Sequence, residues 1–157
     1  MSLNPRPHLV EGQRVVVRGK FLYLAGVKFD VKGVTYGPFR PDADGCEYGD
    51  PARVESDFAG IVATGCNAVR VYTVPPRWLL NLAEAAGLRV MVGLPWEQHV
   101  TFLEDRSAMR RIVQSVRDGV RACAGHPAVL CFTVGNEIPA SVVRYLGPSA
   151  VEQFLKR

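Results

Sequence analysis

The stretch Ala128-Val-Leu-Cys-Phe-Thr-Val-Gly-Asn-Glu-Ile138 decides the fold that we expect for this chain. It is an apolar run, rich in Val, Leu and Phe, that ends abruptly at Gly135, Asn136 and Glu137. Such a run is typical of a parallel strand that is buried on both faces. In α/β proteins the loops after the strands carry the ligands, because the strand interiors are sealed. We therefore expect Glu137 to present its carboxylate at the C-terminal mouth of a parallel sheet.

The segments before this strand repeat an order of one strand followed by one helix. Apolar runs bounded by turn residues predict three earlier strands, over 31–36, 66–72 and 88–94. Capping residues, prolines at first turns and terminal glycines predict helices over 50–65, 75–87 and 107–123, the last capped by Ser107. One short helix is expected after Pro139, and a last one from Ser149. Strands that alternate with helices imply a parallel sheet with right-handed crossovers.

The N-terminal part is expected to form a small cap. Short strands over 14–17, 21–24 and 27–31 are separated by turn chemistry at Arg18-Gly19-Lys20 and Ala25-Gly26. This divides the chain into an N-terminal tail and β-hairpin cap over 1–30 and a (β/α)4 half-barrel over 31–157. The polar loop between the first core strand and the first helix is long enough to suggest a functional role.

Alternation within the strands predicts which side chains face the interior of a barrel. In the second core strand, Val69 and Val71 lie opposite Arg70 and Tyr72. In the fourth strand, one face carries Leu130, Phe132 and Val134, and the other carries Cys131, Thr133, Gly135 and Glu137. The large aliphatic face should pack against helices, and the small or polar face should look into the barrel and its mouth. The expected fold class is α/β, a half (β/α)8 TIM barrel with about four βα units and an N-terminal β-hairpin cap.

Composition excludes several classes of function. The chain has 157 residues, of which 48% are hydrophobic and 22% are charged, as expected for one soluble domain. The sequence has no run of about eighteen apolar residues, so no transmembrane helix is expected within it. The N-terminus has no apolar signal core, so we expect a cytoplasmic protein or a cytoplasmic-side module of a membrane protein.

Charge and cysteine patterns point away from nucleic acid and metal. The net charge of +4 comes from arginines that are spread along helical patterns without interleaved aromatics, so no nucleic-acid partner is expected. The four cysteines lack C-x-x-C spacing, so we expect free thiols with no metal-ligand or disulfide role. We expect neither a metal site nor a cofactor, and a doubly wound cofactor-binding fold is a distant alternative, because no G-x-G-x-x-G or P-loop follows a strand.

Three motifs give the chain a resemblance to a known family. Gly33-Val-Thr-Tyr-Gly37, Asn67-Ala-Val-Arg-Val-Tyr72 and Gly135-Asn-Glu137 resemble the first half of the (β/α)8 glycoside hydrolases of clan A, which are retaining enzymes. More narrowly, Tyr36-Gly-Pro-Phe39 and Gly93-Leu-Pro-Trp-Glu-Gln-His99 resemble a hydrolase-like module at the N-terminus of some bacterial proteins that carry a family 2 glycosyltransferase. Val74-Pro-Pro-Arg-Trp78 and Gly135-Asn-Glu-Ile-Pro139 belong to the same narrower resemblance.

The resemblance implies roles for individual residues. Glu137 would be the general acid and later the base, Asn136 would hydrogen-bond the sugar 2-hydroxyl, and Arg70 would hold the nucleophilic carboxylate. Retaining hydrolysis needs two carboxyl groups about 5–5.5 Å apart. Candidate substrate-binding residues are Tyr36, Tyr72, Trp96, Glu97 and His99. Each has an ordinary structural alternative. Arg70 could fill the barrel interior beside a local acidic partner, and Trp96 could form part of the barrel wall instead of a stacking surface for a sugar ring.

The nucleophile that the resemblance requires is a Glu at the end of a seventh strand, and the chain supplies about four units. After Glu137 the only other Glu is Glu152, in a terminal helix pattern. We therefore expect a truncated, retaining hydrolase-like or transglycosylase-like module for β-glucan-type sugars that has little or no activity in isolation. Either a homo-oligomer closes the half-barrel, or the missing half belongs to a longer chain. The alternative function is a non-catalytic carbohydrate-binding or assembly module attached to a glycosyltransferase.

Overall fold

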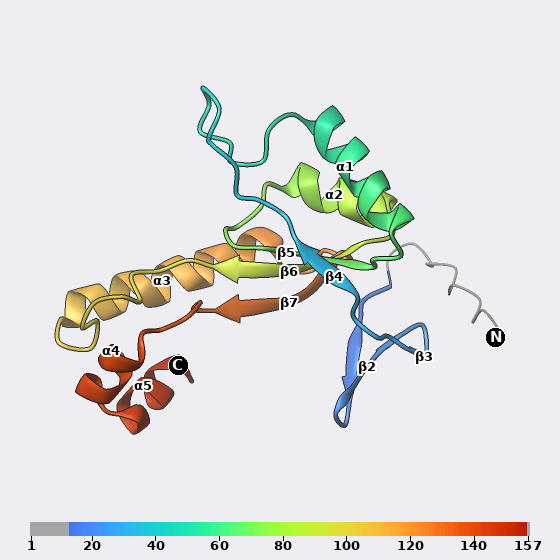
Figure 1. Ribbon diagram of the computed structural model, residues 1–157. Helices are drawn as coiled ribbons and strands as arrows, with labels where there is room; N and C mark the ends of the chain where they lie inside the picture. The colour runs from blue at the N-terminus through green and yellow to red at the C-terminus, as the bar shows by residue number, and fades with distance from the viewer. Residues whose placement is uncertain (1–12, 157) are drawn as a thin grey trace.

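The computed structural model describes residues 13–156, and the part of the expected N-terminal tail at 1–12 lies outside them. Two sheets are present (Figure 1). An antiparallel sheet holds β1 (Val16–Arg18), β2 (Phe21–Leu24) and β3 (Val27–Lys28). A parallel sheet has the order β4-β5-β6-β7 and consists of β4 (Gly33–Thr35), β5 (Ala68–Val71), β6 (Arg89–Leu94) and β7 (Val129–Val134).

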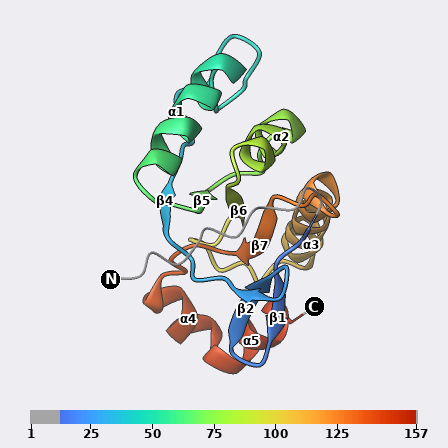
Figure 2. The same cartoon turned by 90° about the vertical axis from the view of Figure 1, so that its right-hand side faces the viewer.

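Three helices connect the parallel strands in turn, and two short helices follow β7. These are α1 (Pro51–Ala63), α2 (Arg77–Ala85), α3 (Arg106–Cys123), α4 (Ala140–Leu146) and α5 (Pro148–Leu155). Figure 2 shows α1, α2 and α3 in a row along one side of the sheet, with α4 and α5 apart from that row. The expected alternation of strands and helices around a parallel sheet is confirmed. Within residues 13–156, no helix combines the length and apolarity needed to cross a membrane.

Element boundaries differ from the sequence expectation at several ends. The first core strand is shorter than 31–36, and α3 begins one residue before Ser107, with Asp105 as its N-cap. The Asp105 side chain accepts a hydrogen bond from the Ser107 backbone N–H at 2.7 Å, so Asp105 takes the capping role that was expected of Ser107. For α1 the prediction holds, since Asp50 caps the helix and Pro51 occupies its first turn.

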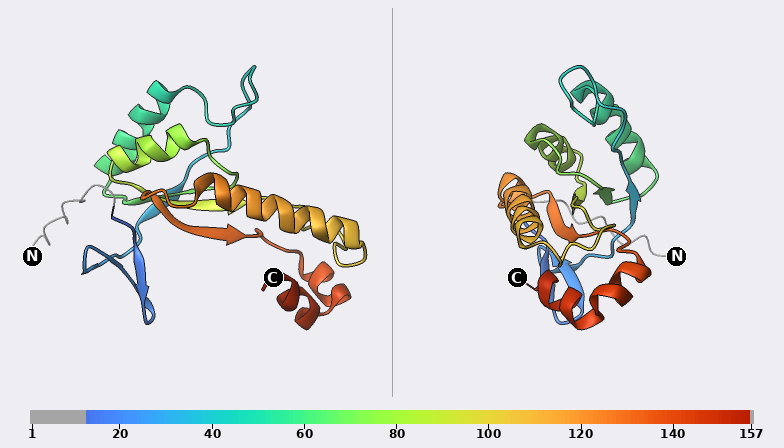
Figure 3. Two further views of the ribbon diagram at one scale, coloured as in Figure 1. Left: turned by 180° about the vertical axis from the view of Figure 1, so that it is seen from behind. Right: turned by 90° about the vertical axis from the view of Figure 1, so that its left-hand side faces the viewer.

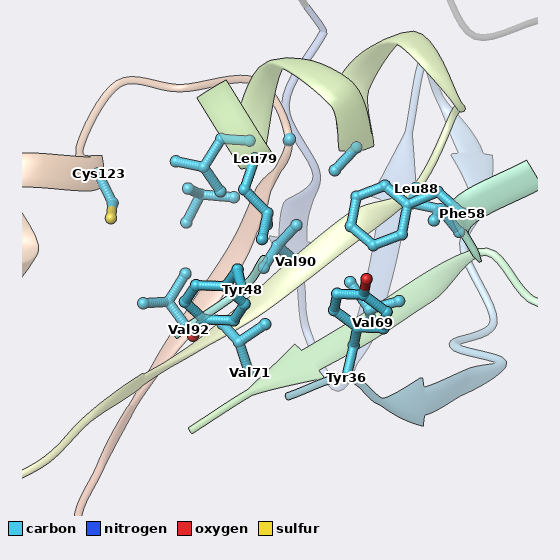
Figure 4. Packing of buried hydrophobic residues seen from close by; sticks show 14 of the residues in the cluster. Tyr36, Tyr48, Phe58, Val69, Val71, Leu79, Leu88, Val90, Val92 and Cys123 are labelled. Carbon is cyan, nitrogen blue, oxygen red and sulfur yellow. The ribbon is translucent and has the colours of Figure 1, made fainter. Parts of the chain in front are cut away.

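The main core lies between the parallel sheet and its helices (Figure 4). The sheet face that carries Val69 and Val71, called the outer face below, packs against Phe58 of α1 and Leu79 of α2, and all four side chains are at most 1% exposed. Val90 and Val92 of β6 continue this face and are fully buried. The expectation that the aliphatic face meets the helices is therefore confirmed, and Arg70 lies on the opposite, inner face.

The antiparallel sheet lies near the N-terminal end of the parallel strands, and the strands point away from it (Figure 3). Asn67, just before β5, fixes the chain between the two sheets. Its side-chain amide donates to the Asp30 carbonyl at 2.8 Å, and its side-chain oxygen accepts from the Lys32 backbone N–H at 2.8 Å. The carboxyl ends of the strands are consequently left open at the other end of the sheet.

His126 joins the turn after α3 to α2 and is only 2% exposed. Its Nδ1 accepts from the Ala128 backbone N–H at 3.2 Å, and its Nε2 lies 2.9 Å from the Asn81 side-chain oxygen. The neutral tautomer with its proton on Nε2 satisfies both contacts. Burial lowers the pKa of His126, and the Glu84 carboxylate only partly opposes this.

Acidification should therefore destabilise the fold through His126. The unfolded chain takes up the proton more readily than the folded chain, so stability falls as the pH drops through the ordinary histidine value of about 6.5 towards the lower folded value. Urea unfolding measured between about pH 8 and pH 5 should show this loss. The variant His126→Gln, which cannot titrate, should have a flatter profile, and an unchanged slope in the variant would contradict the assignment.

Candidate functional site

A cavity of about 510 Å³ lies at the carboxyl ends of the parallel strands. Every strand of the parallel sheet, or the loop that follows it, contributes to the wall. Ligands bind at this end in parallel sheets of α/β proteins, because the strand ends are open to solvent and the loops after them can vary without disturbing the sheet. The lining residues are Pro38, Arg70, Tyr72, Thr73, Gly93, Leu94, Pro95, Trp96, Gln98, His99, Thr133, Gly135 and Asn136.

The polar centre of the cavity is the pair Arg70 and Asn136. Arg70 donates from Nη2 to the Asn136 side-chain oxygen at 2.6 Å, which links the end of β5 to the loop after β7. The guanidinium carbon lies 4.6 Å from the centre of the Tyr72 ring, in cation–π contact. Because the Asn136 oxygen is engaged, its amide nitrogen remains as a hydrogen-bond donor. The structure thus brings three predicted site residues together.

Gln98, which was not among the predicted site residues, positions Asn136. Its side-chain oxygen accepts from the Asn136 backbone N–H at 2.5 Å, and its side-chain nitrogen donates to the Asn136 backbone carbonyl. Gln98 is 7% exposed, whereas its neighbours Glu97 and His99 are exposed. The predicted residues therefore flank the one that holds the site. An uncharged amide between two ionisable residues gave no functional signal.

Two glycines make room for this arrangement. A Cβ at Gly93 would lie 2.5 Å from the Tyr72 carbonyl oxygen, so β5 and β6 can approach here only without a side chain. Gly135 has φ +84°, and a Cβ there would lie 3.1 Å from the Gln98 side-chain oxygen. A larger residue at either position would disturb the cavity wall.

The chain turns at Gly135, and this decides where Glu137 lies. Gly135 and Glu137 were expected on the inner face of a continuing strand, but β7 ends at Val134. The positive φ of Gly135 breaks the alternation, and Asn136 rather than Glu137 lines the cavity. Glu137 itself has φ +54° and is exposed next to the cavity-lining Asn136. Its carboxylate is therefore a neighbour of the cavity and not part of its wall.

Tyr36 and Glu97 also do not line the cavity. Tyr36 is 6% exposed and lies on the outer face, where its hydroxyl donates to Asp57 of α1 at 2.8 Å. Burial, reinforced by Asp57, raises its pKa. Its register explains this, since Thr35 pairs with Arg70 on the inner face and the next residue points the other way. Tyr36 is accordingly a core residue here and offers no surface to a sugar in this cavity.

Trp96 both lines the cavity and belongs to a second apolar cluster. Its ring packs edge to face with Phe102 at 4.7 Å and with Phe154 of α5 at 6.1 Å. Trp96 is half-buried and forms part of the cavity wall. Tyr72, which is 37% exposed, is the more accessible aromatic surface. Through Phe154, α5 thus supports the Trp96 part of the cavity wall.

The cavity lining contains no Asp or Glu. Arg70 is the lining residue with a permanent charge, and His99 is the other ionisable base. Cys131, on the inner face, has a thiol whose pKa is raised by burial, which disfavours its nucleophilic thiolate form. Across residues 13–156, no group of three or more His, Cys, Asp or Glu side chains is arranged to hold a metal ion.

Comparison with known proteins places this fold among glycoside hydrolases. No family model and no curated protein sequence matches the chain. Among solved structures, Parabacteroides merdae β-glucuronidase superposes with a TM-score of 0.71 and 18% identity over 92% of this chain and 18% of that chain. The GH2 β-galacturonidase of Eisenbergiella tayi gives 0.70 and 18% identity over 92% of this chain and 26% of its own.

Gas2 is similar with a TM-score of 0.63 and 23% identity, over 94% of this chain and 38% of that chain. The chain therefore spans less than two fifths of the length of each of these three proteins. At these identities the likeness establishes a glycoside hydrolase-like fold and leaves the reaction open.

Removal of the Gln98 side-chain amide should loosen the site and destabilise the protein. Gln98→Leu leaves the Asn136 N–H and carbonyl without partners, at a cost of about 1–3 kcal/mol for each group that stays unsatisfied. The matched control is Gln114→Leu on the exposed face of α3, where the amide bonds only to Asp118 and the change should stay within about 0.5 kcal/mol. Urea unfolding measures both, and equal losses would contradict the role of Gln98.

Proposed function

We propose that this chain is a glycoside hydrolase-like, carbohydrate-binding module that carries the acid/base half of a retaining site for β-glucan-type sugars. One observation carries the proposal: Arg70, Asn136 and Tyr72 converge in a cavity at the carboxyl ends of the strands of a glycoside hydrolase-like fold. An accessible aromatic ring beside fixed hydrogen-bond donors is the combination that sugar rings require, since they present apolar faces and polar edges.

The residues would divide the work as follows. A sugar ring lies against Tyr72, and the Asn136 amide nitrogen donates to a ring hydroxyl. Arg70 meanwhile donates to the Asn136 side-chain oxygen and so fixes the amide. Glu137, at the rim, protonates the leaving oxygen and later activates water. The positive φ of Glu137 brings its carboxylate out of line with β7, so the bound sugar has to extend from the cavity towards the rim.

Retaining chemistry also needs a carboxylate about 5–5.5 Å from the acid. None lines the cavity within the described part of the chain. The isolated chain should accordingly bind a sugar without hydrolysing it. The same observation favours the second candidate, a non-catalytic carbohydrate-binding or assembly module beside a glycosyltransferase, in which Glu137 has no chemical role.

Binding should depend on Tyr72. In an NMR titration with a β-linked glucose disaccharide, Tyr72→Ala should weaken binding several-fold, in line with about 0.5–1.5 kcal/mol for a lost ring contact. Tyr145→Ala is the matched control, because Tyr145 is 68% exposed on α4, where it donates to Glu104. Equal effects of the two variants, or no binding by the unaltered protein, would contradict the sugar site.

Turnover separates the two candidate functions. We expect the isolated chain to leave an aryl β-glucoside intact, because one carboxylate cannot complete the double displacement. Sustained release of the aryl group that Glu137→Gln abolishes would contradict the half-site proposal and show that a second carboxylate is in place. A polypeptide that supplies the missing half of the barrel could also be added. Turnover that then appears and depends on Glu137 would contradict the non-catalytic alternative.

The edges of the parallel sheet suggest how the site could be completed. Within residues 13–156, β4 and β7 each pair with one strand only, which leaves a row of backbone donors and acceptors on both edges. We propose that a second copy pairs β7 with β4 of the first, and the reverse, and so closes a barrel.

Light scattering during gel filtration tests this closure. The expected molar mass is twice the 17.2 kDa of one chain. A mass of one chain at every concentration tested would contradict the pair, while the sugar-binding prediction would stand on its own.

A further inference from the structure

The antiparallel sheet has two chemically different faces. Cross-strand partners and every second residue of a strand share a face, and the face called the basic face below carries Val16, Arg18, Phe21, Tyr23 and Lys28. The opposite, aliphatic face carries Val17, Leu22, Leu24 and Val27. Leu24 is only 2% exposed, whereas Phe21 is 41% exposed and the Lys28 side chain is 50% exposed. The basic face is therefore open to solvent.

The positive charge of the chain is concentrated in and beside this sheet. Residues 13–32 contain five Lys or Arg and a single acid, Asp30, which is an excess of four positive charges. The whole chain has the same net charge of +4, so the basic residues outside 13–32 are balanced by acids. Asp30 lies 3.1 Å from Lys28, but both side chains are at least half exposed, and such a pair is weak. The basic face consequently attracts an anionic partner.

The aromatic rings of the basic face discriminate between anionic partners. The Lys28 Nζ lies 4.7 Å from the centre of the Phe21 ring, and the Lys20 Nζ lies 5.5 Å from it. The Arg18 guanidinium carbon lies 5.5 Å from the centre of the Tyr23 ring. A nucleic acid would stack its bases on open ring faces, and here cations lie over both rings. A bilayer surface accommodates both groups together, since cations meet the headgroups while aromatic and apolar side chains enter the boundary beneath them.

Exposed aliphatic side chains near the turns of the sheet favour a bilayer as well. Val16 is 45% exposed, Val17 71% and Val27 52%. Such side chains gain nothing from a phosphate backbone, but they leave water when they enter a lipid interface. Burial of the basic face against another half-barrel would be costly, because its cations would lose their hydration.

We propose that the antiparallel sheet docks by its basic face on an anionic lipid bilayer. Arg18, Lys20 and Lys28 bind the headgroups, while Phe21 and Val16 reach the boundary of the acyl chains. The cavity lies at the carboxyl ends of the parallel strands, away from the antiparallel sheet, so the docked protein keeps its cavity open to solvent (Figure 1). The basic face contains no residue of the cavity lining, so docking is independent of sugar binding.

Vesicle sedimentation tests the docking, with vesicles of phosphatidylcholine alone compared with vesicles of phosphatidylcholine and phosphatidylserine. The unaltered protein should bind the anionic vesicles and be released by salt, because salt screens the attraction. Each basic residue near such a surface strengthens binding about fivefold, so Lys20→Gln combined with Lys28→Gln should weaken it about 25-fold. The matched control, Arg106→Gln combined with Arg110→Gln, removes the same charge from the exposed start of α3 and should change binding by less than about twofold.

A second pair of variants tests the apolar contribution. Phe21→Ser should weaken vesicle binding at least about fivefold, because a ring that enters the lipid boundary is removed from water. The same change should leave any binding to duplex DNA unaltered, since it removes no charge. Phe39→Ser is the matched control, because Phe39 is 43% exposed on a loop outside the antiparallel sheet, and vesicle binding should persist there.

Three outcomes would overturn the docking. These are absence of binding to the anionic vesicles, equal binding to both kinds of vesicle, and equal losses in the two charge variants. Binding to duplex DNA without binding to vesicles would also overturn it, and would identify a surface for an anionic polymer instead. The comparison of the two vesicles and the release by salt use the unaltered protein, so both remain decisive if a substitution disturbs the sheet.

Discussion

Burial of the outer face of the parallel sheet is the constraint on which the rest of the structure depends. Val69, Val71, Val90 and Val92 are almost completely removed from water beneath α1 and α2. Because side chains alternate across a strand, a shift by one residue would bring Arg70 into that apolar layer and expose the valines. The hydrophobic layer thus fixes the strand register, and the register directs the guanidinium to the inner face. The chemistry of the site is a consequence of how the core is packed.

The cavity depends on a different kind of contact, made by loops after the strands have ended. Gly135 adopts a positive φ just past β7, where the strand ends, and the Gln98 side chain pairs with both backbone groups of Asn136 in the way a neighbouring strand would. This clamp places the Asn136 side chain against Arg70. Packing of Trp96 on Phe102 and Phe154 holds the loop that supplies Gln98. The wall is therefore built from contacts between residues far apart in the sequence.

The sequence-based predictions agree with the structure for the sheet and its helices and fail in the loops after the strands. Alternation and capping residues predicted the order of strands and helices and the faces of Val69 and Arg70, because these depend on local periodicity. Tyr36 was expected at the site and lies in the core, although its register, one residue past Thr35, already indicated the outer face. For Glu137 the error came from extending β7 beyond Val134, since alternation carries no information after a residue with positive φ.

The sequence by itself determined the α/β class, the parallel sheet, the inner position of Arg70 and the concentration of polar residues after the strands. It could do so because one repeating pattern of apolar residues suffices to bury one face of each element. The tertiary structure alone decided that Gln98 holds Asn136, that Glu137 stands outside the cavity wall, and that Arg70 meets an amide instead of a carboxylate. These outcomes depend on side chains from separate loops that meet in space, and no local pattern encodes which donor will find which acceptor.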